Sequence, residues 1–269
     1  MSIDINTIML AIASTSFYML VVVLAVVRWN HSGSSVTAGV GATLSPLWIA
    51  LALHGFLLYN LVLQADGINL SFAVSQTLFT WCITLLSAII ALRTRLLFIV
   101  VIMCVLCGLS IIAALCIPIH TSEYEPLSLF LAVHILLSIL SYSLLSIAAI
   151  IAVLLGIQDY QLHHHRPGRV LKLLPPLQTM ESLMFRLIET GFVMLSFALV
   201  SGFMFADDLF THKIVFSCIA WLVFLILLLG RHFAGWRGQK AIRWTLAGVA
   251  SLMLAFFGTK LVLEFILAH

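Results

Sequence analysis

Charged residues are scarce in this 269-residue sequence. Asp, Glu, Lys and Arg together make up only 9% of it, whereas 63% is hydrophobic. A soluble domain has about 25% charged residues and needs them to cover its surface. The scarcity of charge therefore excludes an ordinary water-soluble protein and indicates that most of the surface faces the lipid bilayer.

Long apolar runs separate the few polar segments. Crossing a hydrocarbon layer of about 30 Å takes about 20 helical residues. Runs of that length predict an all-α, polytopic membrane helix bundle with about eight transmembrane helices. The predicted spans are residues 6–27, 44–63, 71–92, 96–118, 127–156, 187–205, 214–230 and 244–266. We expect one membrane domain over 1–269, with a first helical half (1–157), a cytoplasmic loop (158–186) and a second half (187–269).

Basic residues cluster in alternate loops. Because such loops stay in the cytoplasm, their positions predict the orientation. Eleven of the thirteen Lys and Arg residues lie in the first, third, fifth and seventh loops, and acidic residues dominate the opposite side. Both termini are therefore predicted to lie outside the cytoplasm. No basic residue precedes the first apolar run, so we expect a retained span and no cleaved signal peptide. The net charge of +3 reflects topology and gives no case for nucleic-acid binding.

The sequence also lacks the usual marks of an enzyme. It has no evident Ser-His-Asp set, phosphate-binding glycine loop or paired carboxylates inside a span. An ion-coupled transporter would need such acids or broken helices, so a small-solute transporter is only a minor alternative. Cys104-x-x-Cys107 lies within a span with no histidine directly after it, so covalent haem attachment is not indicated.

Three histidines lie in or at the ends of predicted spans, where ionisable side chains are costly and therefore functional candidates. His54 is near the middle of the second span, His134 near the outer start of the fifth, and His232 at the cytoplasmic end of the seventh. The helical face of His134 continues with Ser138, Ser141 and Tyr142. This stripe could pack against another helix or line a pocket in which an imidazole binds iron. The pattern alone leaves both interpretations open.

Three segments carry a family resemblance. They are the stretch from Leu173-Leu174-Pro175-Pro176 through Ile188 to Ser201-Gly202, the stretch from His134 to Tyr142, and the loop Gly235-Trp236-Arg237-Gly238 before the last helix. Together they span roughly residues 125–266 in the right order. In them the sequence resembles the cytochrome c assembly (CcsA/CcmC-like) family of haem-handling membrane proteins. Within that family it is most similar to the short YpjD-like branch, which is related to the HemX-like proteins.

The resemblance implies a b-type, non-covalently bound haem held by histidines in the bundle. His134 matches the outer-face ligand of the family, and His232 matches the histidine at the cytoplasmic end of the penultimate helix. His54 is expected to partner His232 on position alone. His269, at the outer end of the last helix, and His212, in the outer loop, are further ligand candidates. Trp81 and Trp221 lie inside spans and pack either against the macrocycle or against other helices.

One departure from the family concerns tryptophan. Members that deliver haem to apocytochrome have a tryptophan-rich outer loop, whereas residues 205–213 here contain no tryptophan. The resemblance therefore favours a haem-binding protein of the bacterial inner membrane that handles or transports haem. The alternative is a non-catalytic regulatory or scaffolding protein that binds another membrane protein.

Overall fold

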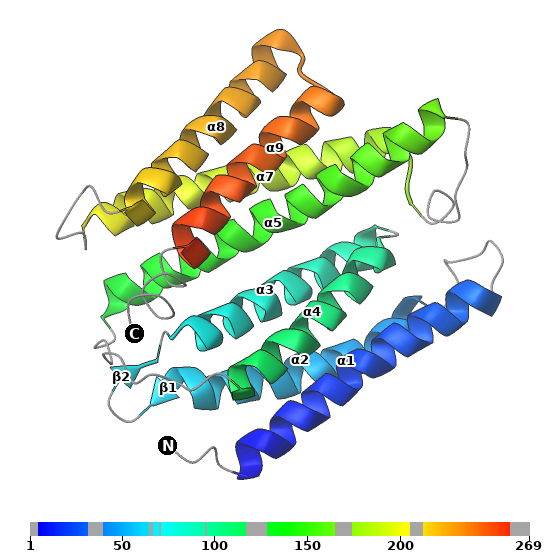
Figure 1. Cartoon of the computed structure of the whole chain (residues 1–269), viewed down its shortest axis with the longest axis vertical. Helices are drawn as coiled ribbons and strands as arrows, with labels where there is room; N and C mark the ends of the chain where they lie inside the picture. The colour runs from blue at the N-terminus through cyan, green and yellow to red at the C-terminus, as the bar shows by residue number, and fades with distance from the viewer. Residues whose placement is uncertain are drawn as a thin grey trace. The chain divides into compact units, whose positions relative to one another are not determined.

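The computed structural model describes residues 5–31, 40–64, 67–69, 71–94, 96–116, 128–164, 174–204 and 212–258. Within these residues the chain is almost entirely helical (Figure 1). The amino-terminal helices are α1 (Ile5–His31), α2 (Val40–Val62), α3 (Phe72–Arg93) and α4 (Leu97–Cys116). The carboxy-terminal helices are α5 (Leu129–His163), α7 (Leu177–Phe203), α8 (His212–Ala234) and α9 (Gln239–Met253), the last continuing as the π-helix η1 (Leu254–Gly258). A small antiparallel ladder joins α2 to α3 and consists of β1 (Leu63–Gln64) and β2 (Gly67–Ile68).

The chain divides into two compact units. The first comprises residues 1–127 with 172–174, and the second comprises 128–171 with 175–269. In the first unit α1 contacts α2 and α4, and α3 contacts the same two helices. In the second unit α5 contacts α7 and α9, and α8 contacts the same two helices. Each unit is therefore a closed arrangement of four helices.

Small and apolar residues fill the core of the first unit. Tyr18, Leu47, Val100 and Cys107 are each fully buried there. Hydroxyl side chains in this apolar interior bond back to the carbonyl one turn earlier, as Thr77 does to Ala73 at 2.7 Å. This satisfies the hydroxyls without a water molecule, which allows α3 to carry a polar stripe inside a membrane bundle.

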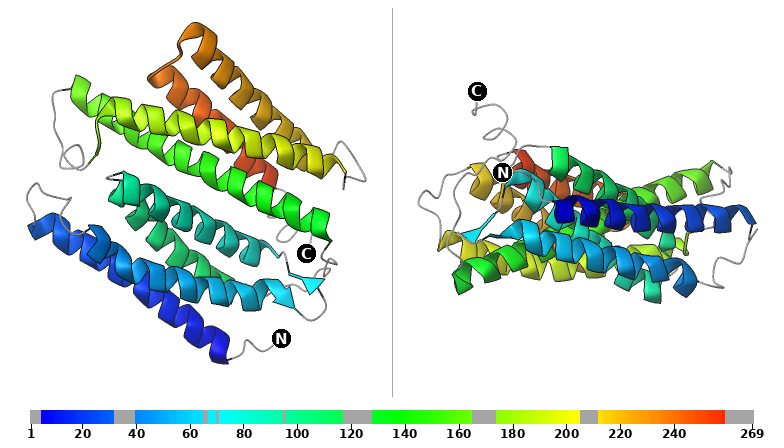
Figure 2. Two further views of the ribbon diagram at one scale, coloured as in Figure 1. Left: turned by 180° about the vertical axis from the view of Figure 1, so that it is seen from behind. Right: turned by 90° about the horizontal axis from the view of Figure 1, so that it is seen from below.

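The longest contact in the second unit is between α5 and α7, which lie side by side along most of their length (Figure 2). Gly191 of α7 makes the close approach possible, because a Cβ there would lie 2.8 Å from Cγ of Leu145 on α5. The hydroxyl of Ser141 donates to the carbonyl of Gly191 at 2.9 Å across the same contact. A small residue and an interhelical hydrogen bond are the usual means of joining helices in lipid.

The fold confirms the predicted membrane helix bundle. Seven helices within the described residues are long and apolar enough to cross a membrane. The eighth predicted span corresponds to α9 with η1, and its remainder, from residue 259, lies outside the described residues. Large apolar side chains such as Met9, Phe197 and Leu222 are exposed, as expected for a surface that faces acyl chains. The orientation of the termini stays a prediction.

Two helix ends lie within the predicted cytoplasmic loop of residues 158–186, whose location stays a prediction. Helix α5 continues to His163 and α7 already begins at Leu177, so much of that loop is helical. Polar contacts support these extensions, because Gln158 donates to the carbonyl of Pro175 at 3.1 Å and Gln239 donates to Asp159 at 2.8 Å. The boundary between the compact units also precedes α5, whereas the predicted halves divide after it.

Candidate functional site

His54 is fully buried in the first unit, on α2. Its Nδ1 lies 3.1 Å from the hydroxyl oxygen of Tyr18 on α1, and the two rings meet edge to face at 83°. The other ring nitrogen, Nε2, is also buried and has no hydrogen-bond partner. A buried nitrogen without a hydrogen-bond partner lowers the stability of the fold by about 1–3 kcal/mol. Nε2 of His54 is therefore a candidate to bind a ligand.

Trp81 of α3 contacts α2 at two residues that flank His54 in the sequence. Its indole N–H donates to the carbonyl of Leu51 at 2.9 Å. Gly55 faces the same ring, and a Cβ there would lie 3.4 Å from Cζ2 of Trp81. Of the two predicted roles for Trp81, the structure displays packing against another helix.

His134 is half-buried near the start of α5, in the second unit. Its Nδ1 lies 2.9 Å from the hydroxyl oxygen of Ser201 on α7. The Ser201 hydroxyl donates its proton to the carbonyl of Ala198 at 3.0 Å, so its oxygen is left to accept from Nδ1–H of His134. Gly202 admits the ring, because a Cβ there would lie 3.0 Å from Cε1 of His134.

The predicted stripe beyond His134 mostly packs between helices. Ser141 is buried and bonds to Gly191, and Tyr142 packs against Phe256 of η1 with ring centroids 5.9 Å apart. Ser138 is half-buried on the same helix. Trp221 of α8 likewise donates its indole N–H to Ser196 at 2.8 Å and stacks on Phe192 at 5.4 Å. Within this stripe, His134 with Ser201 and Gly202 of α7 therefore retains the geometry of a ligand site.

The remaining ligand candidates are less well supported. His232 is exposed near the end of α8, and its ring meets that of its sequence neighbour Phe233. His54 and His232 belong to different units, so their pairing stays a prediction. The side chain of His212 and the whole of His269 lie outside the described residues.

The motif Gly235-Trp236-Arg237-Gly238 forms the tight connection between α8 and α9. Both glycines have positive φ, 62° and 58°, a conformation that other residues rarely adopt. The Trp236 ring lies so close to Gly230 that a Cβ there would come within 2.4 Å of Cδ2, and its backbone N–H donates to the Gly230 carbonyl at 3.1 Å. Lys240 lies over the Trp236 ring, with Nζ 4.1 Å from the ring centroid.

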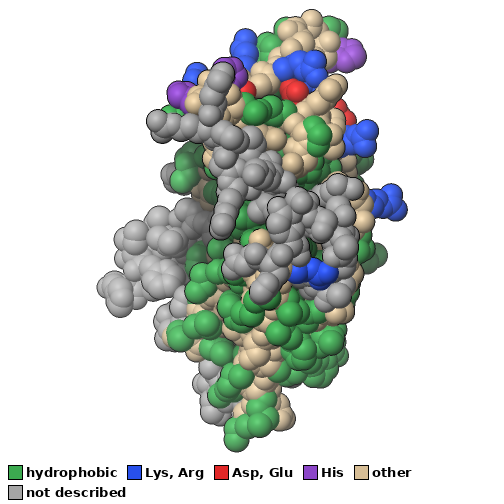
Figure 3. All heavy atoms as spheres, turned by 90° about the vertical axis from the view of Figure 1, so that its right-hand side faces the viewer, with side chains coloured by type: hydrophobic (Ala, Val, Ile, Leu, Met, Phe, Trp, Pro, Cys, Tyr) green, Lys and Arg blue, Asp and Glu red, His purple; other side chains and the backbone are tan. Residues whose placement is uncertain are grey.

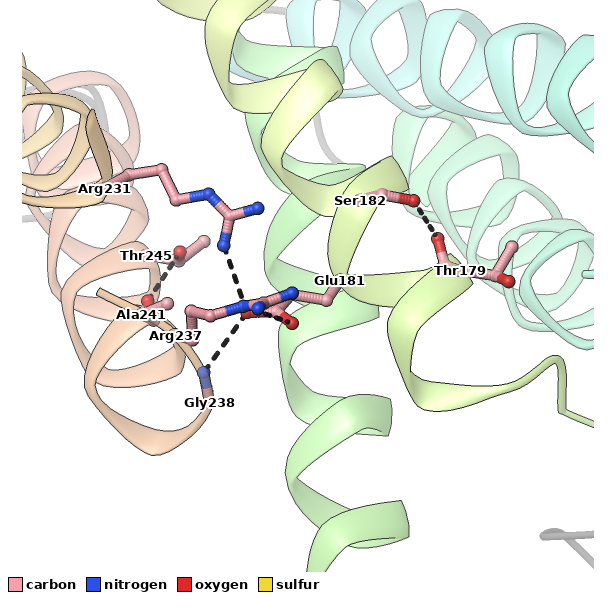
Figure 4. A network of polar contacts seen from close by, with 8 residues as sticks. All are labelled: Thr179, Glu181, Ser182, Arg231, Arg237, Gly238, Ala241 and Thr245. Carbon is pink, nitrogen blue, oxygen red and sulfur yellow. Dashed lines mark hydrogen bonds and ion pairs between the residues drawn. The ribbon is translucent and has the colours of Figure 1, made fainter. Parts of the chain in front are cut away.

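Glu181 on α7 anchors this connection, as Figure 4 shows. Its carboxylate lies 3.4 Å from Nη1 of Arg231 and 3.5 Å from Nε of Arg237, and it accepts from the backbone N–H of Gly238 at 3.3 Å. Gly238 is the N-cap of α9, so the carboxylate also lies at the positive end of that helix. The sequence did not single out Glu181, although it lies within a family-like segment.

Charged side chains gather at the upper end of the face seen in Figure 3, and most of the described side chains toward its lower end are hydrophobic. The ion pairs of Glu181 lie at the end of the second unit where α8 meets α9. The His134 contact lies at the opposite end, because it involves the start of α5 and the end of α7. The second unit therefore has an anchored, charged end and an end that presents an imidazole.

The described residues fit single-histidine ligation of a haem iron better than a bare metal ion. They contain no group of three or more His, Cys, Asp and Glu side chains that could hold a metal ion. His54 and His134 each engage Nδ1 with a hydroxyl from a neighbouring helix. Metal-ligating histidines commonly hold one ring nitrogen in this way and bind through the other.

Comparisons with known proteins agree with these observations. The chain is 29% identical over 224 residues to the inner membrane protein YpjD of Escherichia coli K12, covering 81% of this chain and 85% of that protein. It is 27% identical over 90 residues to the cytochrome c biogenesis protein CcsA of Prochlorococcus marinus, covering 31% of this chain and 28% of that protein. The CcsA protein of Cyanophora paradoxa is 28% identical over 97 residues, covering 34% of this chain and 30% of that protein.

No solved structure matches the chain. The model of the family described as cytochrome C assembly protein matches residues 42–267. This range includes His54, His134 and the connection between α8 and α9. The chain therefore belongs to the cytochrome c assembly protein family.

Proposed function

We propose that the protein is a haem-handling protein of the bacterial inner membrane that binds b-type haem non-covalently through His134 and His54. The observation that carries the proposal is shared by the two histidines. In each, Nδ1 is engaged by a hydroxyl of a neighbouring helix, at 2.9 Å in His134 and 3.1 Å in His54. In His54 the other ring nitrogen, Nε2, has no hydrogen-bond partner and is the nitrogen suited to iron.

The two histidines differ in access. His134 is half-buried near the start of α5, whereas His54 is fully buried among α1, α2 and α3. Haem therefore reaches His134 without rearrangement of the unit, and reaches His54 only after the neighbouring helices separate. We expect a fast phase of haem association at His134 and a slow phase at His54.

The chain's own contribution is ligation, orientation and an apolar environment, and it needs no bond-making residue. The inner-membrane location is supported by the similarity to YpjD, which is named as an inner membrane protein. The haem itself is supported by the family and by partial similarity to CcsA proteins, which are named for cytochrome c biogenesis.

The test is to titrate the full-length protein in lipid nanodiscs with haemin and to record the Soret absorbance over time after each addition. In His134→Ala the affinity of the site that binds haem in the fast phase should fall more than about tenfold, since even outer-shell partners of metal ligands contribute about 10–100-fold. The slow phase should disappear in His54→Ala. His164→Ala is the matched control, because His164 is an exposed histidine just beyond the opposite end of α5.

A titration in which neither substitution changes the spectrum would exclude both histidines as ligands. A titration that shows only the absorbance of free haemin at all concentrations would instead favour the regulatory or scaffolding alternative, in which the fold is kept and another membrane protein is bound.

A further inference from the structure

Helix α9 has two opposite faces. One face is buried in the second unit and includes Ala241, Thr245 and Leu252. The opposite face is exposed, continues into the first residue of η1, and consists of Lys240, Arg243, Leu246, Ala247, Ala250 and Leu254. Residues at this spacing lie on one side of a helix. The exposed face of α9 therefore begins with two cations and continues as an apolar strip.

An aromatic ring positions Lys240 at the start of this face. Its Nζ lies 4.1 Å from the centroid of the Trp236 ring. The Trp236 ring packs closely against Gly230 and lies 5.4 Å from the ring of Trp244, centroid to centroid. An ammonium group has three N–H donors, and a ring face engages only one side of it. The ammonium of Lys240 is therefore held in place and can still bind an anion.

The carboxylates near the start of α9 are engaged by other groups. Glu181 pairs with both Arg231 and Arg237, at 3.4 Å and 3.5 Å (Figure 4). Asp159 accepts from the side-chain amide of Gln239 at 2.8 Å. Among the residues that the structure describes, neither carboxylate forms an ion pair with a cation of the exposed face. The face therefore begins with two positive charges that no described carboxylate neutralises.

The dimensions of the exposed face of α9 fit one lipid molecule. Tryptophan side chains of membrane proteins gather at the level of the lipid headgroups, which places Trp236 and Trp244, and the cations beside them, at that level. From Arg243 to Leu254 the helix rises about 16 Å, which is about half the thickness of the hydrocarbon layer. A headgroup bound at Lys240 and Arg243 therefore leaves its acyl chains along the apolar part of the face.

We infer that the exposed face of α9 is a binding site for an anionic phospholipid, whose phosphate contacts Lys240 and Arg243. A Lys or Arg beside a membrane contributes about fivefold to the affinity for anionic lipid, which is about 1 kcal/mol. Two such cations favour phosphatidylglycerol over phosphatidylcholine, whose headgroup has no net charge, by about 25-fold. The site does not depend on haem, because it lies at the opposite end of the second unit from His134.

The test is native mass spectrometry of the full-length protein in detergent, titrated separately with phosphatidylglycerol and phosphatidylcholine of the same chain length. We expect the first phosphatidylglycerol to bind about 25-fold more tightly than the first phosphatidylcholine. The double variant Lys240→Gln/Arg243→Gln should bind the two lipids about equally. Lys240→Arg/Arg243→Lys keeps both positive charges and should keep the preference.

Arg93→Gln is the matched control for Arg243→Gln. Arg93 is an exposed arginine at the end of α3, in the first unit. Arg243→Gln should lower the affinity for phosphatidylglycerol about fivefold, and Arg93→Gln should leave it unchanged. Equal affinities of the wild type for the two lipids, or equal losses in the two single variants, would overturn the inference.

The wild type provides two tests without any substitution. Inorganic phosphate and glycerophosphoglycerol, the headgroup without acyl chains, should not displace the bound phosphatidylglycerol at equal concentration. Displacement by either would indicate a site for a soluble anion and overturn the assignment to lipid. The preference for phosphatidylglycerol should also weaken as the concentration of ammonium acetate rises, since salt screens exposed charges. A preference that does not change with salt would refute the role of the two cations.

Discussion

The two candidate histidines, His54 and His134, are each oriented by a residue of a neighbouring helix. Ser201 orients His134 while Gly202 leaves room for its ring, and Tyr18 does the same for His54. In each case the hydroxyl that contacts the imidazole comes from another helix. The geometry of each imidazole therefore depends on how two helices pack, and small changes in that packing alter the site.

Glu181 is the residue whose removal should disturb the charged end of the second unit most. Its side chain is only 12% exposed, forms ion pairs with two guanidinium groups and accepts a hydrogen bond from one backbone N–H. Glu181→Ala leaves these groups without an acceptor, so we expect a loss of about 1–3 kcal/mol in the free energy of unfolding. Thermal unfolding in detergent, followed by tryptophan fluorescence, measures it.

Two further variants define this effect. Glu181→Gln keeps an oxygen for the N–H of Gly238 and should lose less stability than Glu181→Ala. Glu189→Ala removes an exposed carboxylate from the same helix and should change the melting temperature little. Equal losses in Glu181→Ala and Glu189→Ala would show that the contacts of Glu181 do not stabilise the unit.

At the scale of the elements, the apolar runs predicted where helices cross the membrane but not where they end. Helix α5 continues beyond the end of the run 127–156, to His163, and α7 begins ahead of the run 187–205, at Leu177. Beyond the apolar part the helices are supported by distant partners, such as Gln239 bonding to Asp159 across 80 residues of sequence. Hydropathy contains no information about such contacts.

The same limit applies to the candidate site. His54 and His134 could be selected from the sequence, because an ionisable side chain inside a span is costly and rare. Tyr18 and Ser201 could not be selected as their partners, because the register between helices decides which hydroxyl meets which imidazole. The glycines of the α8–α9 connection were found through the family resemblance, while their positive φ angles emerge only from the structure.

The contact between α5 and α7 should be sensitive to a single methyl group. In Gly191→Ala the new Cβ would lie 2.8 Å from Leu145, so the two helices must move apart. Overpacking of this kind costs about 1–3 kcal/mol, and it should lower the melting temperature of the protein in detergent.

Gly156→Ala is the matched control for Gly191→Ala. Gly156 lies in α5, and the nearest atom to its added Cβ is 3.8 Å away, which is ordinary van der Waals contact. Since alanine favours the helix over glycine by about 0.5–1 kcal/mol, this variant should be as stable as the wild type or more stable. A Gly191→Ala protein as stable as Gly156→Ala would contradict the proposed close packing.

For the whole molecule, the charge distribution predicts that both termini lie outside the cytoplasm. A reporter alkaline phosphatase, which is active only outside the cytoplasm, should be active when fused after residue 269 and inactive when fused within residues 165–173. Green fluorescent protein should give the opposite pattern. A fluorescent carboxy-terminal fusion would reverse the predicted orientation of every span.

The anchor at Glu181 has a consequence for biosynthesis. Glu181 is synthesised 57 residues before Gly238, so α7 leaves the ribosome before the groups that neutralise its carboxylate do. Until those groups arrive, the unpaired carboxylate is stable only where water solvates it, at the membrane surface. Closing of the α8–α9 turn onto Glu181 is therefore a late event, and a nascent chain released before Arg231 carries an acidic site that no later residue can neutralise.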